Sequence, residues 1–540
     1  MPGQDASCAE VMAAGLQNAG VRSLFAYPGD PIIEFMEQCR QGGTDVVLAT
    51  REGTAAFMAE AEAMVTGGIG AVVSTLGPGS TALVNGVAAA TLDRVPVIAI
   101  SGQIETARQS FFTHQVVDHT LVFSPVTKWA GQVYSGSVGT TLRKALRTAT
   151  AERPGAVHLS CAADTFKAGT PDTDVTAPPG AEAVTSAYVC RPAGSSADPH
   201  AMLAAARKPV ILAGIGAVRA GASGALGRLA ERAGLPVVVA PMAKGVFDED
   251  SPWFAGTLDM ACNQRLWDFL ASSDLIVAAG FDPVELIKPW RLRVPVLHVD
   301  ATANIDQVYP SEVEVLGQIA ASLDWLADAW TGQPRWAEAE VSAHREALRA
   351  EYYAGRVRGK LNPTDVIDVV QAAFPAGTIA TTDVGSHKLL VGQGWRPHGP
   401  RSVLMSNGLS SMGFGLPAAI AAKATFPGRP VVALIGDGGF AMTAPELRQA
   451  AARDIGVAVV VFADGSLNRI ELKQSALGYP STATRIAGMD LVGLAEAMGC
   501  DGARAGTATE LESAVAKAAD LTRPLIIEAC IDPAQYQSQF

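Results

Sequence analysis

VVALIGDGGFAMTAPELRQAAARDIGVAVVVFADGSLNRIELKQ, residues 431–474, is the stretch that decides the fold. It predicts a buried strand, a glycine-rich turn that contains Asp437, a helix, and a second buried strand that ends at Asp464. In a parallel sheet the carboxyl ends of neighbouring strands meet at one edge, where the ligands of such folds bind. The two carboxylates are therefore expected to face one cavity.

The turn between the first strand and the helix suits a phosphate group. Gly438 and Gly439 lack Cβ atoms, so their N–H groups can approach a phosphate closely at the start of the helix. Mg²⁺ prefers oxygen ligands and is usually held by one or two carboxylates together with phosphate oxygens. The stretch therefore predicts a site for a magnesium-bound phosphate. A turn that simply ends a strand has the same local form, and residues 431–474 alone leave both interpretations open.

Two further parts of the chain show the same alternation of β-rich and helical runs. Between residues 10 and 160, DVVLAT, IGAVVSTLG and VPVIAISG alternate with TAAFMAEAEAMV and STALVNGVAAATL. A second block runs from KPVILAGIG to VPVLHVDAT, and a third begins near residue 361. Alternation of this kind predicts βαβ units on parallel sheets. The expected fold class is α/β, with three doubly wound parallel-sheet domains.

The composition of two stretches indicates where these domains begin and end. Residues 171–195 are dominated by Pro, Gly, Ser, Thr and Ala, which predicts an interdomain linker. Residues 336–360 are charged and helical in pattern and are expected to connect the second and third domains. The expected domains are therefore residues 1–170, 196–335 and 361–540.

Composition also narrows the class of partner. The net charge of -12 and the absence of a Lys/Arg-rich run make nucleic acid an unexpected partner and favour a small molecule. Seven scattered cysteines without a CxxC pair argue against a disulfide framework or a zinc site and fit a reducing cytoplasm. No apolar run approaches the roughly 20 residues that span a bilayer, and the N-terminus has no export signal. We expect a cytoplasmic protein without a membrane partner.

The stretch at 431–474 resembles the thiamine diphosphate motif, in which a GDG is followed further along by an Asn pair. The pair here is Ala463-Asp464, and Asp464 keeps an oxygen ligand and adds negative charge, so Mg²⁺ binding is expected to survive the substitution. The resemblance implies a metal site made by Asp437, Asp464 and the main-chain carbonyl of Ser466. It also implies a diphosphate site at Gly436, Asp437, Gly438, Gly439, Asp464 and Ser466.

VLATREGTAAFMAEAEAMVTGGIGAVVSTLGPGSTALVNG, residues 47–86, is similar to the pyrimidine-binding domain of the same enzymes. The resemblance implies that Glu52 contacts the aminopyrimidine ring and favours its imino tautomer, whose 4′-nitrogen removes the C2 proton of the coenzyme. Taken alone, Glu52 is equally an ordinary glutamate at a helix N-terminus, where the helix dipole favours it. Two matched halves in one chain favour the catalytic role.

Two shorter stretches resemble other parts of the coenzyme site. In SNGLSSMGFGLPAAIAAK, residues 406–423, Met412 matches the bulky apolar residue that supports the bent coenzyme, and the main chain of Ser410 and Met412 would bind the ring edge. DVGSHK resembles an additional diphosphate-binding turn made by Gly385, Ser386 and His387. Plain core packing is the alternative for Met412, as is a satisfied core histidine for His387.

From about residue 8 to residue 535 the chain resembles acetolactate synthase catalytic subunits, through RPGAVHLS, DVGSH, SNG and MGFGLPAAI. GFDPVEL, residues 280–286, is similar to the flavin-free catabolic branch and lacks the Arg-containing segment of synthases that carry FAD, so FAD is not expected. The resemblance implies decarboxylation of a 2-oxo acid such as pyruvate and carboligation to a second carbonyl compound. It also implies a homodimer or homotetramer with active sites at subunit interfaces.

Two residues, Asp30 and His114, depart from the synthase pattern. Asp30 lies in YPGD where the catabolic synthases have PGAK, and PGD resembles simple 2-oxo acid decarboxylases, in which this Asp handles protons. His114 and Gln115 stand where synthases commonly have Phe-Gln and those decarboxylases have His-His, while THQ is also similar to carboxyethylarginine synthase. With Glu52 these are the catalytic candidates. The plainer interpretations are that Asp30 caps a turn and that His114 fills a wall.

Several functions stay open at this point. The leading hypothesis is a carboligase of the acetolactate synthase type, and the second is a non-oxidative decarboxylase that releases an aldehyde. A carboxyethylarginine synthase-like enzyme or another carbon-carbon ligase or lyase is the third. A cofactor-binding protein without catalysis is suggested by Ala463 and disfavoured by Glu52, because a binding module does not need ring activation.

Overall fold

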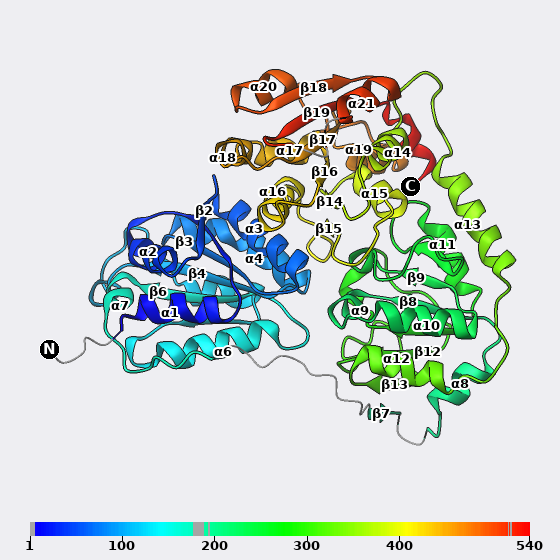
Figure 1. The fold of residues 1–540 in the computed structure, drawn as a ribbon, viewed down its shortest axis with the longest axis horizontal. Helices are drawn as coiled ribbons and strands as arrows, with labels where there is room; N and C mark the ends of the chain where they lie inside the picture. Colours follow the sequence, from blue (N-terminus) through cyan, green and yellow to red (C-terminus); the bar gives the residue numbers. More distant parts are fainter. Residues whose placement is uncertain (1–5, 177–187, 193–194, 517, 519–520) are drawn as a thin grey trace. The chain divides into compact units, whose positions relative to one another are not determined.

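The computed structural model describes residues 6–176, 188–192, 195–516, 518 and 521–540 (Figure 1). The chain forms two compact units. Unit 1 comprises residues 1–181, 409–427 and 443–455, and unit 2 comprises residues 182–408, 428–442 and 456–540. Much of the predicted linker, residues 177–187 and 193–194, lies outside the described residues.

Unit 1 is built on a six-stranded parallel sheet in the order β2-β1-β3-β4-β6-β5. Its strands include the three β-rich runs that the sequence predicts for this block. The bounds are β1 (Ser23–Tyr27), β2 (Asp45–Leu48), β3 (Gly70–Ser74), β4 (Val97–Gln103), β5 (Trp129–Gln132) and β6 (Val157–Ala162). Strands β3, β4 and β6 are buried along their whole length, as expected for parallel strands covered on both faces.

Helices cover both faces of this sheet, which makes it doubly wound (Figure 1). One face carries α1 (Cys8–Asn18), α2 (Ile33–Gln41), α6 (Val138–Thr150) and α7 (Ala163–Lys167). The other carries α3 (Glu52–Thr66), α4 (Pro78–Leu92) and α5 (His119–Phe123). Two helices from the C-terminal part of the chain, α16 (Gly415–Thr425) and α18 (Glu446–Ala452), also belong to unit 1. The edge-to-face contact of Phe57 with Phe414, at 5.8 Å between ring centroids, joins α3 to the residue before α16.

Unit 2 contains the second sheet, in the order β10-β9-β8-β11-β12-β13-β7. The bounds are β7 (Tyr188–Cys190), β8 (Pro209–Ala213), β9 (Val237–Val239), β10 (Phe254–Thr257), β11 (Leu275–Ala279), β12 (Val296–Asp300) and β13 (Val313–Leu316). All neighbours are parallel except β7, which pairs antiparallel with β13. The predicted linker therefore contributes an edge strand. The composition of residues 171–195 did not indicate this strand. β7 has only three residues and pairs only with β13, so it leaves no periodic pattern in the sequence.

Several helices connect or flank the strands of the second sheet. They are α8 (Pro199–Ala205), α9 (Ile215–Arg219), α10 (Ser223–Ala233), α11 (Asn263–Ala271) and α12 (Ile319–Asp328). Helix α13 (Glu338–Tyr352) forms within the predicted helical connection and contacts β10.

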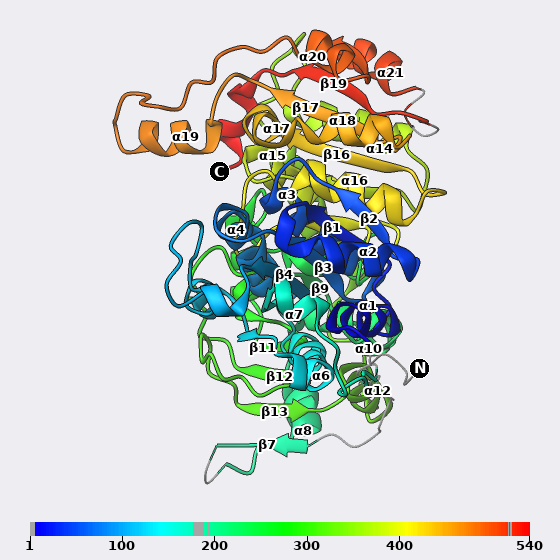
Figure 2. The same cartoon turned by 90° about the vertical axis from the view of Figure 1, so that its left-hand side faces the viewer.

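The third sheet, also in unit 2, has the order β15-β14-β16-β17-β19-β18 and is parallel throughout. Its strands are β14 (Ile379–Thr382), β15 (Val403–Met405), β16 (Val431–Gly436), β17 (Ala458–Ala463), β18 (Asp501–Ala505) and β19 (Leu525–Cys530). The helices that follow or flank them are α14 (Pro363–Ala373), α15 (Ser386–Gly394), α17 (Asp437–Thr443), α19 (Asn468–Ala476), α20 (Leu491–Ala497) and α21 (Ala508–Val515). With three sheets of this kind, the predicted fold class is confirmed. Figure 2 shows α19 to one side of the third sheet, and none of its residues is buried.

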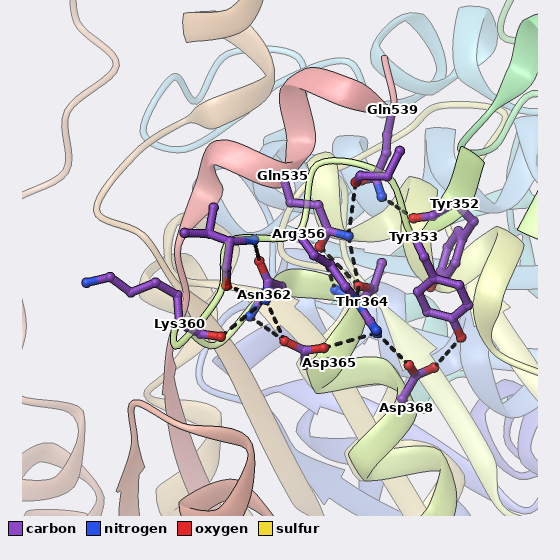
Figure 3. Close-up of polar contacts among 12 residues, drawn as sticks. Tyr352, Tyr353, Arg356, Lys360, Asn362, Thr364, Asp365, Asp368, Gln535 and Gln539 are labelled. Atoms are coloured by element: carbon purple, nitrogen blue, oxygen red, sulfur yellow. Dashed lines mark hydrogen bonds and ion pairs between the residues drawn. The ribbon is translucent and has the colours of Figure 1, made fainter. Parts of the chain in front are cut away.

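The C-terminal 3-10 helix, Pro533–Ser538, is tied to the start of α14 (Figure 3). Gln535 accepts hydrogen bonds from the main-chain N–H and the hydroxyl of Thr364, at 3.2 and 3.1 Å. Arg356 forms ion pairs with Asp365 and Asp368 at 3.0 and 2.9 Å. These contacts fix the N-terminus of α14, which leads into β14 and thus to one of the turns described below.

Helices long and apolar enough to cross a bilayer are absent from the part of the chain that the structure describes.

Candidate active site

The predicted catalytic residues of unit 1 follow the carboxyl ends of neighbouring strands. The order β2-β1-β3 reverses direction between β1 and β3, and such a switch point is where open α/β sheets bind ligands. Asp30 follows β1, and Glu52 follows β2. The loop Thr75–Gly79, which runs from the end of β3 into the first turn of α4, lies at the same edge.

Glu52 is the first residue of α3 and is half-buried. A Cβ atom at Gly79 would lie 2.9 Å from the Glu52 Oε1 atom and 2.7 Å from the Thr75 side chain. Gly79 therefore leaves the space that the carboxylate occupies beside the start of α4. A first-turn position is also what an ordinary helix-starting glutamate would have. The catalytic role of Glu52 stays a prediction.

Gly29, next to Asp30, and Gln115 both approach the same loop closely. A Cβ atom at Gly29, next to Asp30, would lie 2.4 Å from the Thr75 side chain. A Cβ atom at Gly77, whose φ is +53°, would lie 2.7 Å from the Gln115 carbonyl oxygen. The loop Thr75–Gly79 thus lies between the Asp30 turn, Glu52 and Gln115.

His114 is exposed and places its ring edge-on to Phe112, at 6.4 Å between ring centroids. Asp30 is also exposed, in the 3-10 helix Asp30–Ile32. The residue that the sequence analysis missed is Thr75, around which these segments gather. The Gly-Pro-Gly run after a buried strand was the available signal, because it forces a tight turn at the sheet edge.

The predicted metal and diphosphate residues of unit 2 lie at the corresponding switch point of the third sheet. Here β14 and β16 are neighbours, and the chain order reverses between them. Residues 383–387 follow β14, Asp437 follows β16, and Asp464 follows β17. The structure therefore brings the turn of Gly385, Ser386 and His387 to the same edge as the two acids.

Asp437 and Asp464 are two partly buried carboxyl groups that interact with each other. The Oδ2 atom of Asp437 accepts a hydrogen bond from the Gly465 N–H at 2.8 Å, and the Oδ1 atom of Asp464 accepts one from Ser466 at 3.0 Å. Burial, and then the negative charge of Asp437, raise the pKa of Asp464 to about 7. Burial also raises the pKa of Asp437. A divalent cation would relieve this repulsion, so the donor set fits Mg²⁺.

Within the described residues, no group of three or more His, Cys, Asp or Glu side chains gathers to hold a metal. A cation at Asp437 and Asp464 would thus need further oxygens, such as the Ser466 carbonyl and those of a diphosphate. Ser466 is buried, and its main chain forms an isolated antiparallel bridge with Arg485. The third predicted metal ligand is therefore held in place by the chain around it.

His387 is buried beside the glycines of both turns. A Cβ atom at Gly436 would lie 2.9 Å from its ring, and one at Gly385 would lie 2.6 Å from it. Its Nε2 atom has no hydrogen-bond partner in the described part of the chain. Burial lowers the pKa of His387 to about 3, which keeps the ring neutral. An unpaired buried nitrogen is costly and fits a site that a ligand completes.

Gly439 has a packing role that its sequence did not show. A Cβ atom there would lie 1.8 Å from the Asp383 Oδ2 atom, so the turns after β14 and β16 touch at this glycine. Ser386 donates a hydrogen bond to Asn468 at 2.9 Å, which links the first turn to α19. Contacts of Gly438 and Gly439 with a phosphate stay a prediction.

Ser410 and Met412 belong to unit 1, as Glu52 does. Both are half-buried, and Ser410 has a φ of +54°. Between them, Ser411 accepts a hydrogen bond from Asn85 of α4 at 2.8 Å. The segment is thus anchored to the helix that begins near Glu52, while contacts of Ser410 and Met412 with a ring stay a prediction.

The second sheet has its own switch point, between β8 and β11. Glu285 of the GFDPVEL segment is fully buried there and accepts a hydrogen bond from the Ile215 N–H at 2.9 Å. A Cβ atom at Gly214 would lie 2.5 Å from the Glu285 Oε2 atom. The Glu285 carboxyl group thus lies against the turn at Gly214, at the switch point of this sheet.

A cavity of about 1040 Å³ lies elsewhere in unit 2, lined by residues of β10, α13, α14 and the segment 393–398. None of the predicted site residues lines it.

Comparisons with known proteins agree with this arrangement. Residues 6–122 match the family described as thiamine pyrophosphate enzyme, N-terminal TPP binding domain, residues 199–326 match its central domain, and residues 383–529 match its C-terminal TPP binding domain. Each match contains one of the three sheets in large part. The first and third matches contain the sites around Glu52 and Asp437.

The chain is also similar to known proteins along nearly its whole length. It is 27% identical to an acetolactate synthase of Bacillus subtilis over 540 residues, which cover 97% of this chain and 93% of the relative. It is 30% identical to a probable acetolactate synthase large subunit of Methanocaldococcus jannaschii over 547 residues, 98% of this chain and 92% of the relative. It is 29% identical to a probable 2-ketoarginine decarboxylase of Pseudomonas aeruginosa over 515 residues, 92% of this chain and 89% of the relative.

The order of the three matched domains, the acids at two sheet edges and the full-length relatives lead to one conclusion. The chain belongs to the thiamine pyrophosphate enzyme family and is a thiamine pyrophosphate-dependent enzyme related to acetolactate synthases and 2-oxo acid decarboxylases.

Proposed function

We propose that this enzyme decarboxylates a 2-oxo acid such as pyruvate and joins the remaining acyl unit to a second carbonyl compound. The observation that carries the proposal is the set of segments around Thr75, where Glu52, the Asp30 turn and Gln115 meet at one sheet edge. The coenzyme, when bound, supplies the electron sink for decarboxylation. Glu52 would hold a proton at the pyrimidine ring, and Asp30 and His114 would handle substrate protons.

Unit 2 would hold the charged end of the coenzyme. Asp437, Asp464 and the Ser466 carbonyl would bind Mg²⁺, and the turns that contain His387 and Gly438 would bind the diphosphate. Glu285, by occupying the turn at Gly214, supports an enzyme without FAD, and GFDPVEL supports the catabolic branch. Because Glu52 and Asp437 belong to different compact units, a shared coenzyme requires the units to meet within one chain or between subunits. We propose a homodimer or homotetramer with active sites at subunit interfaces.

The second candidate is a non-oxidative decarboxylase that releases an aldehyde. Asp30 favours it, because the structure brings the PGD turn against Thr75, next to Glu52. The similarity to a probable 2-ketoarginine decarboxylase supports it as well. Carboxyethylarginine synthase-like chemistry has no observation of its own beyond the sequence THQ at 113–115.

Product analysis separates these candidates. We expect the full chain, incubated with thiamine diphosphate, Mg²⁺ and pyruvate, 2-ketoarginine or other 2-oxo acids, to release CO2 and form an acyloin adduct. Mass spectrometry of the products identifies the adduct. An aldehyde as the sole product would favour the decarboxylase instead. If none of the 2-oxo acids loses CO2, both proposals are wrong, and a lyase or an aldehyde ligase becomes the better hypothesis.

The role of Gly79 gives a further prediction. We expect Gly79→Ala to lower the rate of CO2 release about a hundredfold, because the new Cβ atom displaces the Glu52 carboxylate and misplacement by about 1 Å has costs of this size. The new Cβ atom also meets the Thr75 side chain at 2.7 Å, so some stability is lost as well, and thermal unfolding measures that loss separately. Gly136→Ala is the matched control, because a Cβ atom at Gly136 meets nothing within 4 Å. Equal rates for the two variants in a steady-state assay would contradict the placement of Glu52.

A further inference from the structure

A buried carboxylate from a distant segment holds the turn that carries Glu52. Glu446, the first residue of α18, is fully buried. Its carboxylate accepts hydrogen bonds from the Thr50 N–H at 3.0 and 3.1 Å and from the Thr50 hydroxyl at 2.6 Å. The Thr54 hydroxyl donates to it as well. All of these residues belong to unit 1.

These contacts hold residues on both sides of the N-cap of α3. Arg51 is the N-cap residue of α3, and its side chain makes no capping hydrogen bond. The first N–H groups of a helix need partners from elsewhere, which a Ser, Thr, Asp or Asn at the N-cap normally supplies. Glu446 supplies an acceptor just before the helix and, through Thr54, a contact within its first turn. Thr50 and Thr54 lie on either side of Glu52 in the sequence. The carboxylate of Glu446 therefore binds the turn both before and after Glu52.

The donors around Glu446 stabilise its charged form. Burial raises the pKa of the Glu446 carboxyl, and the hydrogen bonds from Thr50 and Thr54 offset part of that rise. A carboxylate out of water is tolerated only where donors surround it, and hydrogen bonds to it are stronger than those between neutral groups. A simple packing contact between α18 and α3 would not need a charged group at this position.

We propose that Glu446 is a positioning residue that fixes the turn Thr50–Thr54 and so aims Glu52 at the coenzyme. This role rests on the proposed function, because it concerns the activation of thiamine diphosphate. Glu446 lies within the match to the C-terminal coenzyme-binding domain, whereas Thr50, Glu52 and Thr54 lie within the match to the N-terminal one. A residue of one coenzyme-binding segment therefore sets the geometry of the activating group of the other.

The test compares Glu446→Gln with Arg453→Ala in the full chain. Gln is nearly isosteric, but it replaces one of the two acceptor oxygens by an NH₂ group that cannot accept from Thr50. Arg453 follows the last residue of α18 and forms an ion pair with Asp45 of β2, so its loss weakens the docking of the same helix without touching the turn. A purely structural role would give both variants the same phenotype.

The first measurement uses the coenzyme-free protein. We expect amide hydrogen exchange in peptides that cover residues 49–55 to be faster by about tenfold in Glu446→Gln, the effect of losing one hydrogen bond to a charged group. Exchange in these peptides should be unchanged in Arg453→Ala. Unchanged exchange in Glu446→Gln would show that the carboxylate does not hold the turn and would overturn the proposal.

The second measurement follows the C2 proton of bound thiamine diphosphate with Mg²⁺ in D2O, by quenched-flow NMR. We expect Glu446→Gln to slow its exchange at least about tenfold while the Kd for the coenzyme changes less than about threefold. Exchange as fast as in the wild type, or equally slowed in Arg453→Ala, would overturn the positioning role. A wild-type protein that does not accelerate this exchange over free coenzyme would refute the proposed function itself, whatever the amide exchange of the variants.

Discussion

Glu52→Gln is expected to reduce CO2 release by about a hundredfold to ten-thousandfold, the range that a positioned acid-base group contributes. Gln keeps the size of the side chain but cannot give or take the proton that switches the pyrimidine ring between tautomers. The coenzyme should still bind, because the diphosphate and metal residues lie in unit 2 and are untouched. Steady-state kinetics with the 2-oxo acid substrate, together with calorimetric titration of thiamine diphosphate, measure both quantities.

Glu34→Gln is the matched control for this prediction. Glu34 is also a glutamate in the first turn of a helix, α2, and has the same favourable relation to a helix dipole. It contacts Gln38 and not the loop Thr75–Gly79. If Glu52→Gln and Glu34→Gln had equal activity, Glu52 would be an ordinary helix-starting residue and the proposed mechanism would be wrong.

The second large effect is expected for Asp437→Asn, which should weaken binding of thiamine diphosphate with Mg²⁺ by more than about a hundredfold. Loss of a partner outside the coordination sphere already costs about 10- to 100-fold in metal affinity, and Asp437 is predicted to be a direct ligand. Asn can still accept the hydrogen bond from Gly465, so the turn should keep its form. Calorimetric titration with Mg²⁺ and coenzyme gives the affinity, and removal of Mg²⁺ with a chelator should reproduce the loss in the wild type.

The stability of the metal-free Asp437→Asn protein shows whether weaker coenzyme binding comes from a lost metal ligand or from unfolding. Without metal, Asp437→Asn should be as stable as the wild type or more stable, because it removes a negative charge next to Asp464. Thermal unfolding of the coenzyme-free protein measures this. Asp268→Asn, an exposed acid on α11, is expected to change neither affinity nor stability. A coenzyme affinity of Asp437→Asn equal to that of Asp268→Asn would exclude the metal site.

The positions of the acids at the strand ends could be predicted from local sequence. VVALIG and AVVVFA form β16 and β17 as neighbouring parallel strands, so Asp437 and Asp464 come to one sheet edge whatever the rest of the chain does. The DVVLAT run likewise predicts a strand just before Glu52, whereas no strand was predicted before Asp30. Runs of buried β-branched residues report the strands directly, because a parallel strand covered on both faces has no polar side to interrupt the pattern.

Other features of the site could not be predicted in this way. Thr75 carries no distinctive pattern, and its central place follows from glycines at 29 and 79 that let three segments approach it. The edge strand β7 lies in a stretch whose composition predicts a linker, because an edge strand of three residues depends on its partner β13 and not on its own periodicity.

The sequence by itself therefore determined the α/β class, the three sheets and the edge at which Asp437 and Asp464 lie, because strand formation and strand-end position depend on neighbours in the chain. Only the tertiary structure decided that Glu446 holds Thr50 and Thr54 on either side of Glu52, that Thr75 lies between the Asp30 and Glu52 turns, and that Glu285 occupies the turn at Gly214. These are contacts between residues far apart in the chain. Their geometry depends on how helices and sheets pack, and the periodicity of the sequence does not predict it.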